Sequence, residues 1–205
     1  HGLRRSESRY TMFLDSDAAL TPRALPTLVQ ALDNNPGWGL VGPRLLYDDG
    51  TPQWSCRRFP PLLLPLLRRP PLDRVFERRR TVRRHLMTDF GHDRTRPVLY
   101  LLGACQLFHT ALARKAGPFD ANVFIGWDDA DWCFRIREAG GEIVFVPDAA
   151  VIHTYRRQSR KAPVSRAALH QLHGFVYFQR KYRSRRTSLI RLSRELDGRA
   201  TRGAT

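Results

Sequence analysis

The chain contains few cysteines, and their spacing suits neither a metal site nor a disulfide framework. Cys56, Cys105 and Cys133 are odd in number and form no Cys-x-x-Cys pair. This pattern argues against a zinc site and against a fold held together by disulfides, and it is typical of a reducing compartment. The cysteines therefore favour a cytoplasmic protein.

Long apolar runs are also missing. The longest one, from Leu62 to Leu67, is interrupted by Pro65 and is far shorter than the roughly 20 apolar residues that a membrane-spanning helix needs. The first residues do not show the pattern of a signal peptide. We therefore expect neither a spanning helix nor a secretory leader.

Negative charge is scarce. The 205 residues include 35 Lys and Arg, nearly all of them Arg, against 19 Asp and Glu, which gives a net charge of +16 at pH 7. Such a balance predicts attraction to nucleic acid, to an anionic membrane surface or to phosphorylated ligands. An arginine-rich surface that reflects genomic base composition explains the charge equally well. The apolar fraction of 42% is enough for one domain with a hydrophobic core.

The few acidic residues gather into two clusters. Asp15 and Asp17 directly follow the apolar run 10–14, which reads as a buried strand, and a second cluster, Asp128, Asp129 and Asp131, follows an aromatic, glycine-containing loop. Ligands of α/β sheets bind beyond the carboxyl ends of strands, and paired carboxylates suit Mg²⁺ or Mn²⁺. A carboxylate at a helix start can also serve as a general base. The alternatives are ordinary turn residues and helix caps.

The remaining pattern interleaves strands and helices, which predicts an α/β fold. We expect Thr21 and Asp128 to cap helices, Thr110 to cap a short helix that stops at Gly117, and His153 to end a strand. Residues 57–97 read as a variable, partly helical, surface-exposed insertion, and His92 and His109 lack a functional context. The other expected elements are strands at 39–42, 98–102, 143–146 and 151–152, a turn at 47–50, and a basic helical region from about 165 to 196.

Several segments resemble, in order and interval, glycosyltransferase family 2, the inverting enzymes of the GT-A fold, and in particular bacterial rhamnosyltransferase-like members. The likeness covers roughly residues 10–182 and rests on an ordered set of short motifs rather than on one. The segments that carry it are Phe13 to Asp17 with Thr21 and Pro22, Val41 to Leu45 with Asp49 and Gly50, Gly103 to Cys105, Gly117 to Asp120, Asp128 to Cys133, and Val146, Pro147 and Val151 to His153.

The resemblance implies a role for each matching residue. Asp17, with Asp15 and His153, is expected to hold Mg²⁺ or Mn²⁺ and, through it, the diphosphate of a nucleotide-sugar donor. Asp129 matches the base that deprotonates the acceptor hydroxyl, and Asp128 stands where the family usually has Glu. The resemblance assigns acceptor binding to a last group of residues, namely Gly103, Ala104, Cys105, Trp127 and Asp131.

The resemblance also defines the expected organisation of the chain. The fold class is then a GT-A, Rossmann-like mixed sheet flanked by helices, with residues 1–182 as the catalytic region and 183–205 as a basic helical or flexible tail. Family members place a longer segment, including the first strand and much of the nucleoside pocket, before the Asp-x-Asp strand. This chain has 14 residues before Asp15, so we expect an N-terminally truncated catalytic region.

The favoured hypothesis is a metal-dependent enzyme that moves a sugar, with rhamnose as one candidate, from a dTDP or UDP donor to a lipid-linked or polysaccharide acceptor in cell-wall or surface glycan synthesis. The alternatives are a non-catalytic remnant of such an enzyme and, less favoured, a basic nucleic-acid-binding module. In the tail, Leu189, Leu192 and Leu196 recur at helical spacing among arginines, which suits the anionic inner face of the plasma membrane. A solvated, arginine-rich helix explains that pattern equally well.

Overall fold

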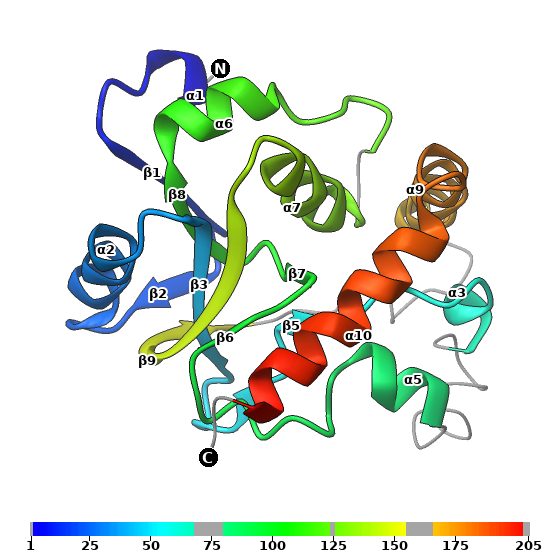
Figure 1. The fold of residues 1–205 in the computed structure, drawn as a ribbon, viewed down its shortest axis with the longest axis horizontal. Helices are drawn as coiled ribbons and strands as arrows, with labels where there is room; N and C mark the ends of the chain where they lie inside the picture. The colour runs from blue at the N-terminus through cyan, green and yellow to red at the C-terminus, as the bar shows by residue number, and fades with distance from the viewer. Residues whose placement is uncertain (1, 68–79, 124–125, 155–165, 203–205) are drawn as a thin grey trace.

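The computed structural model describes residues 2–67, 80–123, 126–154 and 166–202, and it confirms the α/β fold class (Figure 1). A mixed seven-stranded sheet forms the centre, with strand order β1-β8-β3-β9-β2, while β4 pairs with β3 and β6 pairs with β9. A separate two-stranded sheet is formed by β5 (Cys56–Arg57) and β7 (Tyr100–Leu101). The strands of the main sheet are β1 (Tyr10–Leu14), β2 (Ala18–Leu20), β3 (Trp38–Leu46), β4 (Pro52–Gln53), β6 (Arg96–Pro97), β8 (Cys105–His109) and β9 (Glu142–His153).

The parallel pairing of β3 with β9 lies at the middle of the sheet. β8 runs antiparallel to β3 and to β1, and β2 runs antiparallel to the end of β9. The prediction of two separate strands at 143–146 and 151–152 is wrong, because β9 is continuous from Glu142 to His153. The register against β3 shifts where Pro43 opposite Val146 gives way to Arg44 opposite Ala150, so Pro147 and Asp148 lie in a bulge rather than in a turn between strands.

Helices cover both faces of the sheet. Side chains of successive strand residues point to opposite faces, so Val41 and Val144 pack under α2, whereas Leu40 and Ile143 belong to the larger core with α7. Figure 1 shows α2 and α7 on opposite sides of β3 and β9, with α10 running diagonally past α5. The helices are α1 (Gly2–Arg5), α2 (Ala24–Asn34), α3 (Leu64–Leu67), α5 (Arg80–His85), α6 (Thr110–Ala116), α7 (Asp128–Glu138), α9 (Arg166–Lys181) and α10 (Arg186–Arg202).

The three helix starts differ from the predicted caps. α2 begins at Ala24 after Arg23, and the Thr21 hydroxyl instead donates to the Ala150 carbonyl oxygen at 2.8 Å. α6 and α7 begin at Thr110 and Asp128 themselves, so each residue predicted as a cap is the first helical residue. The later start of α2 puts Pro26 in its first turn, where the backbone N–H has no helical partner and proline is tolerated.

The region 57–97 is less exposed than its composition predicts. Phe59, Met87 and Phe90 belong to the larger core, and His92 is 3% exposed, with Nδ1 2.8 Å from the Phe90 carbonyl oxygen. Residues 68–79 of the predicted insertion lie outside the described residues. Of the predicted strand 98–102, only Tyr100 and Leu101 form a strand, and they pair with β5 rather than with the main sheet.

The predicted basic tail begins with α10, and its leucines point inward. Leu196 is 2% exposed, and Leu189 and Leu192 pack against the larger core. Leu196 is thus buried by the protein, and Leu189 and Leu192 are partly buried by it, so the three leucines do not form a fully exposed apolar face for a membrane. Within the described ranges, the structure contains no helix that is both long and apolar enough to span a bilayer.

Two glycines allow β3 and β9 to pair closely at their first residues. A Cβ atom on Gly39 would lie 2.5 Å from Leu112 Cδ2 and 2.6 Å from the Gly141 Cα atom, and a backbone neighbour cannot move aside as a flexible side chain can. Gly37, two residues earlier, has no atom within 4 Å of such a position. Close backbone approach therefore requires glycine at 39 but not at 37.

We expect Gly39→Ala to lower the free energy of unfolding by about 1–3 kcal/mol, as overpacking of a tight interior typically does. The matched control Gly37→Ala should change it by less than about 1 kcal/mol. Urea denaturation followed by circular dichroism measures both. Equal stability of the two variants would contradict the close packing of Gly39 against Gly141.

Candidate functional site

Three of the predicted ligands meet where β1 ends and β9 ends. The turn after β1 carries Asp15 and Asp17, and β2 then pairs with β9 so that Ala18 lies opposite His153. His153 Nε2 lies 3.4 Å from Asp17 Oδ1 and 3.8 Å from Asp15 Oδ2. One ligand atom from each residue falls within 4.8 Å of the others, so the three side chains can converge on one cation.

Gln53 holds the histidine of this group in place. Its side-chain oxygen lies 2.9 Å from His153 Nδ1, and its side-chain nitrogen donates to the His153 carbonyl oxygen at 2.6 Å. A proton on Nδ1 would donate to this oxygen and leave the Nε2 lone pair directed at the two carboxylates. Metal-binding histidines commonly have such a partner on the other ring nitrogen.

The electrostatics of the group fit a cation. Burial raises the pKa of Asp15, and the negative charge of Asp17 raises it further, while His153 lowers it. Two neighbouring carboxylates, one of them partly desolvated, are stabilised by a positive ion between them. Oxygen ligands with one imidazole suit Mg²⁺, Mn²⁺ and similar divalent ions.

The second cluster opens α7 after a backbone reversal. Gly126 and Trp127 both have positive φ, 71° and 73°, and this left-handed geometry is uncommon for a residue as large as tryptophan. The first turn of α7 then holds Asp128 and Asp129 among free backbone N–H groups, and the Asp129 carboxylate accepts from the Ala130 N–H at 2.7 Å. The helix start therefore holds carboxylates as the sequence predicts, but the capping residue is Trp127.

Asp129 is poised to exchange a proton near neutral pH. Desolvation by the surrounding protein, followed by the negative charge of Asp128, raises the pKa of Asp129 to about 7. Burial also raises the pKa of Asp128, to which the charge of Asp15 contributes. A carboxylate with a pKa near the working pH is suited to general base catalysis.

The two acidic clusters and the glycine loop between β7 and β8 form one neighbourhood. The charge of Asp15 acts on Asp128, the Ala104 carbonyl oxygen accepts from the Asp15 N–H at 2.9 Å, and a Cβ on Gly103 would lie 3.4 Å from that of Asp129. The structure thus brings together residues that are more than 100 positions apart in the chain. Chemically, the neighbourhood can hold a cation on one side and accept a proton on the other.

Two of the predicted acceptor residues are buried. Cys105 is the first residue of β8 and 1% exposed, so the prediction that it belongs to a loop is wrong. The Asp131 side chain is 2% exposed and bonds to Arg135 and Lys181 at 2.9 and 2.6 Å and to the Tyr182 hydroxyl at 2.9 Å. These contacts fasten α7 to the end of α9, so they explain this carboxylate as part of the framework.

Gln53 and Arg57 belong to the neighbourhood although the sequence analysis did not select them. Arg57 is 6% exposed, donates to the Cys56 carbonyl oxygen at 2.8 Å, and its positive charge favours the ionised form of Asp129 by lowering its pKa. Neither residue lies in a motif with a recognisable spacing. His109, for which the sequence predicts no function, packs against Tyr10 with ring centroids 4.9 Å apart and the ring planes tilted by 54°.

Comparison with known proteins finds similar sequences. At 25% identity over 176 residues, the chain is similar to N-acetylglucosaminyl-diphospho-decaprenol L-rhamnosyltransferase of Mycobacterium tuberculosis, in both strain CDC 1551 / Oshkosh and strain H37Rv. The match covers 82% of this chain and 54% of the relatives, so the chain spans about half their length.

Two solved structures have a similar fold. GalNAc-T7 with UDP, GalNAc and Mn²⁺ superposes with a TM-score of 0.58 at 14% identity, covering 91% of this chain and 35% of that one. The mannosyltransferase PcManGT from Pyrobaculum calidifontis, in complex with GDP-Man and Mn²⁺, gives a TM-score of 0.50 at 20% identity, covering 87% and 41%.

The mixed sheet flanked by helices therefore has the GT-A fold of glycosyltransferases. The family model described as "Glycosyltransferase like family 2" matches residues 1–172, which is most of the chain. The chain belongs to glycosyltransferase family 2.

Proposed function

We propose that this chain is the catalytic region of a metal-dependent, inverting glycosyltransferase that moves a sugar from a nucleotide-diphosphate donor to a glycan or lipid-linked acceptor. The observation that carries the proposal is the convergence of Asp15, Asp17 and His153, with ligand atoms within 4.8 Å, beside an Asp129 whose pKa is raised to about 7. One group can hold a cation and the other can take a proton, which are the two tasks of such a transfer.

Each residue then has a defined task. Asp15, Asp17 and His153 would hold Mg²⁺ or Mn²⁺, which supplies positive charge for the departing diphosphate. Asp129 takes the proton from the acceptor hydroxyl as that oxygen attacks the anomeric carbon. A single displacement of this kind inverts the anomeric centre. Asp128 keeps the pKa of Asp129 high through its charge.

The acceptor side of the proposed site consists of Gly103, Ala104 and Trp127. Gly103 leaves space beside Asp129, because its position lacks a side chain. The Trp127 indole packs against Phe175 with ring centroids 4.8 Å apart, and its buried N–H lacks a hydrogen-bond partner among the described residues. We assign Trp127 to the acceptor side because it directly precedes the acidic cluster at the start of α7.

The names of similar proteins support the proposed substrates. The mycobacterial relative is named for rhamnose transfer to a diphospho-decaprenol acceptor, and the two structural neighbours were solved with UDP or GDP-Man and Mn²⁺. We therefore favour a dTDP- or UDP-sugar, rhamnose first, and a lipid-linked acceptor of cell-wall synthesis. The proposed location is the cytoplasmic face of the membrane, where the exposed arginines would meet anionic lipid.

The first test is metal affinity. We expect Mn²⁺ to bind the wild-type chain and Asp17→Asn to weaken binding at least about tenfold, while Gln53→Met weakens it about 10–100-fold because His153 loses its orienting partner. Isothermal titration calorimetry measures all three. The control is Asp148→Asn, which removes an exposed carboxylate from β9, the strand that ends at His153. Equal Mn²⁺ affinity in all variants would contradict the metal site.

The second test is the base. We expect Asp129→Asn to lower sugar transfer about 10²–10⁴-fold, the usual contribution of a general base. Because the wild-type carboxylate must be ionised, kcat/KM should fall about tenfold per pH unit below about 7. A transfer assay with dTDP-rhamnose and UDP-sugars over a pH series measures both. Undiminished turnover by Asp129→Asn would remove this residue from the base role.

Asp129→Asn should lower sugar transfer but raise the stability of the fold above pH 7. A raised pKa means that the folded chain holds its proton more tightly than the unfolded chain, so ionisation of Asp129 destabilises the fold progressively between pH 3.8 and about 7. Asn does not ionise. Relative to the wild type, Asp129→Asn should therefore have a higher Tm above pH 7, and that difference should shrink as the pH approaches 3.8. A pH-independent Tm difference would contradict the raised pKa.

A further inference from the structure

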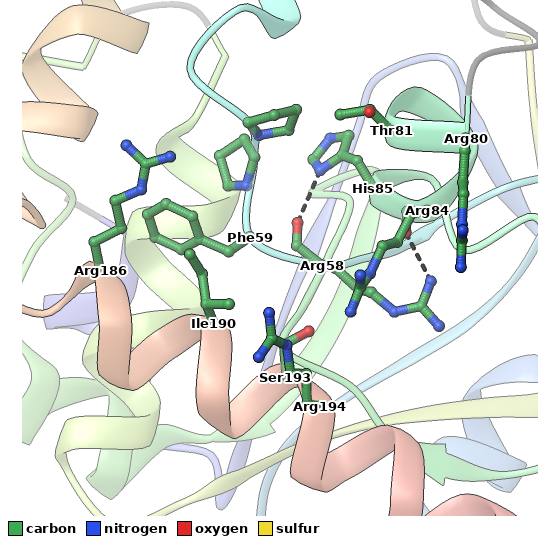
Figure 2. A pocket seen from close by; sticks show the side chains of 12 residues that line it. Arg58, Phe59, Arg80, Thr81, Arg84, His85, Arg186, Ile190, Ser193 and Arg194 are labelled. Atoms are coloured by element: carbon green, nitrogen blue, oxygen red, sulfur yellow. Dashed lines mark hydrogen bonds between the residues drawn. The ribbon is translucent and has the colours of Figure 1, made fainter.

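A cavity lies outside the acidic neighbourhood, between α5, α10 and the segment Arg58 to Pro61. Its volume is about 540 Å³, within the range of roughly 300–1,000 Å³ that small-molecule sites occupy. Figure 2 shows α5 side chains on one side and α10 side chains on the other. The lining consists of Arg58, Phe59, Pro60, Pro61, Arg80, Thr81, Arg84, His85, Arg186, Ile190, Ser193 and Arg194.

The charge of this lining is entirely of one sign. It contains five arginines and no carboxylate. Arg58 is neutralised, because its guanidinium pairs with both Asp89 and Asp197, each through a contact of 2.8 Å. By contrast, the structure gives no ion pair, within its described ranges, for the other four arginines. We name Arg80, Arg84, Arg186 and Arg194 the arginine rim.

The arginine rim predicts an anionic ligand. Four guanidinium groups around one cavity repel one another, and an anion between them relieves that repulsion. The planar, forked guanidinium matches the oxygens of a phosphate group in particular. Thr81 and Ser193 add hydroxyl groups that can donate to the same oxygens.

The inner wall of the cavity is apolar. Phe59 is 8% exposed and Pro60 is buried, and Ile190 projects from α10 beside them. In Figure 2 the Phe59 ring and the Ile190 side chain lie next to each other. A simple arginine-rich surface would not place cations around an apolar hollow. The combination suits a ligand in which a phosphate is joined to a hydrophobic chain.

The cavity reaches toward the proposed acceptor side. His85 lines it, and the ring centroid of His85 lies 6.5 Å from that of Trp127, the residue that directly precedes Asp128. The side chains of His85 and Trp127 therefore connect the cavity lining to the start of α7. A hollow of this size also holds a single head group better than it holds a nucleic-acid strand.

We propose that this cavity binds the phosphate or diphosphate of an amphiphile with an apolar chain, and that in the enzyme this ligand is the carrier part of the lipid-linked acceptor. The second half of this statement rests on the proposed function. The binding itself does not, because it follows from the arginine rim and the apolar wall.

The test compares soluble probes. We expect geranyl diphosphate to bind at least about tenfold more tightly than inorganic pyrophosphate, and geraniol to bind weakly, as measured by isothermal titration calorimetry without metal. The double variant Arg84→Gln/Arg194→Gln should raise the Kd for geranyl diphosphate about 10–100-fold, since each charge-assisted contact to phosphate is lost. Both arginines are exposed, so folding should persist, and circular dichroism checks it.

A charge-matched control separates the cavity from general basicity. Arg83 and Arg191 are exposed residues of the same two helices but do not line the cavity. Arg83→Gln/Arg191→Gln should leave the Kd for geranyl diphosphate within about threefold of wild type. Equal losses in the two double variants would overturn the proposal. Equal affinity for pyrophosphate and geranyl diphosphate would overturn the claim that the cavity also binds the apolar chain of the ligand.

Vesicles distinguish the source of the phosphate. If phosphatidylglycerol vesicles bind through Arg84 and Arg194 while geranyl diphosphate does not bind, the cavity recognises a membrane head group and the acceptor assignment is wrong. The proposed catalytic function fails separately, through unchanged Mn²⁺ affinity in Asp17→Asn or unchanged turnover in Asp129→Asn. We expect the arginine variants to keep wild-type Mn²⁺ affinity.

Discussion

The parallel pairing of β3 with β9 is the contact on which the site depends. β9 ends at His153, and the pairing of Leu46 with Ile152 fixes how far that end extends. β2 then adds to the other edge of β9 and brings Asp17 beside the imidazole, while β4, paired with β3, supplies Gln53. Three strand pairings thus converge on one histidine. A register shift of one residue in any of them would separate His153 from Asp17 or from Gln53.

The site brings together buried carboxylates whose negative charges repel one another. Burial and neighbouring charge raise the pKa values of Asp15, Asp128 and Asp129, so each of these carboxylates costs stability when ionised. The framework around them offsets this cost. The large aromatic core under α7 and the buried bonds of Asp131 to Lys181 and Tyr182 hold the start of α7 in position. Proton exchange near neutral pH is the result of that arrangement.

Sequence reasoning succeeded where one local pattern determines the structure. β1 occupies residues 10–14 as predicted, and the short helix α6 stops at Gly117 as predicted. The two acidic clusters, each set at the end of an element, lie in one neighbourhood as the resemblance implies. In each of these cases, a pattern within about ten residues or an ordered set of motifs was enough to predict the structure.

Sequence reasoning failed where contacts with residues far away in the chain determine the local structure. Pro147 and Asp148 read as a turn, but the parallel partner β3 keeps β9 continuous through a bulge. Asp131 reads as one more acid of a catalytic cluster, although Lys181, 50 positions later, neutralises it. The leucines of α10 carry a membrane-like pattern because a helix packed on a protein core has the same periodicity as one lying on lipid. Gln53 follows no motif, since its role comes only from its distance to His153.

The central claim is that one cation site and one base face each other across the end of the sheet. Crystals of the chain soaked in Mn²⁺, with diffraction data collected at the manganese edge, test it most directly. The account predicts an anomalous peak within about 2–2.6 Å of oxygens of Asp15 or Asp17 and of His153 Nε2, on the side of the turn that faces Asp129. A peak elsewhere, or none at a Mn²⁺ concentration that saturates binding in solution, would contradict it.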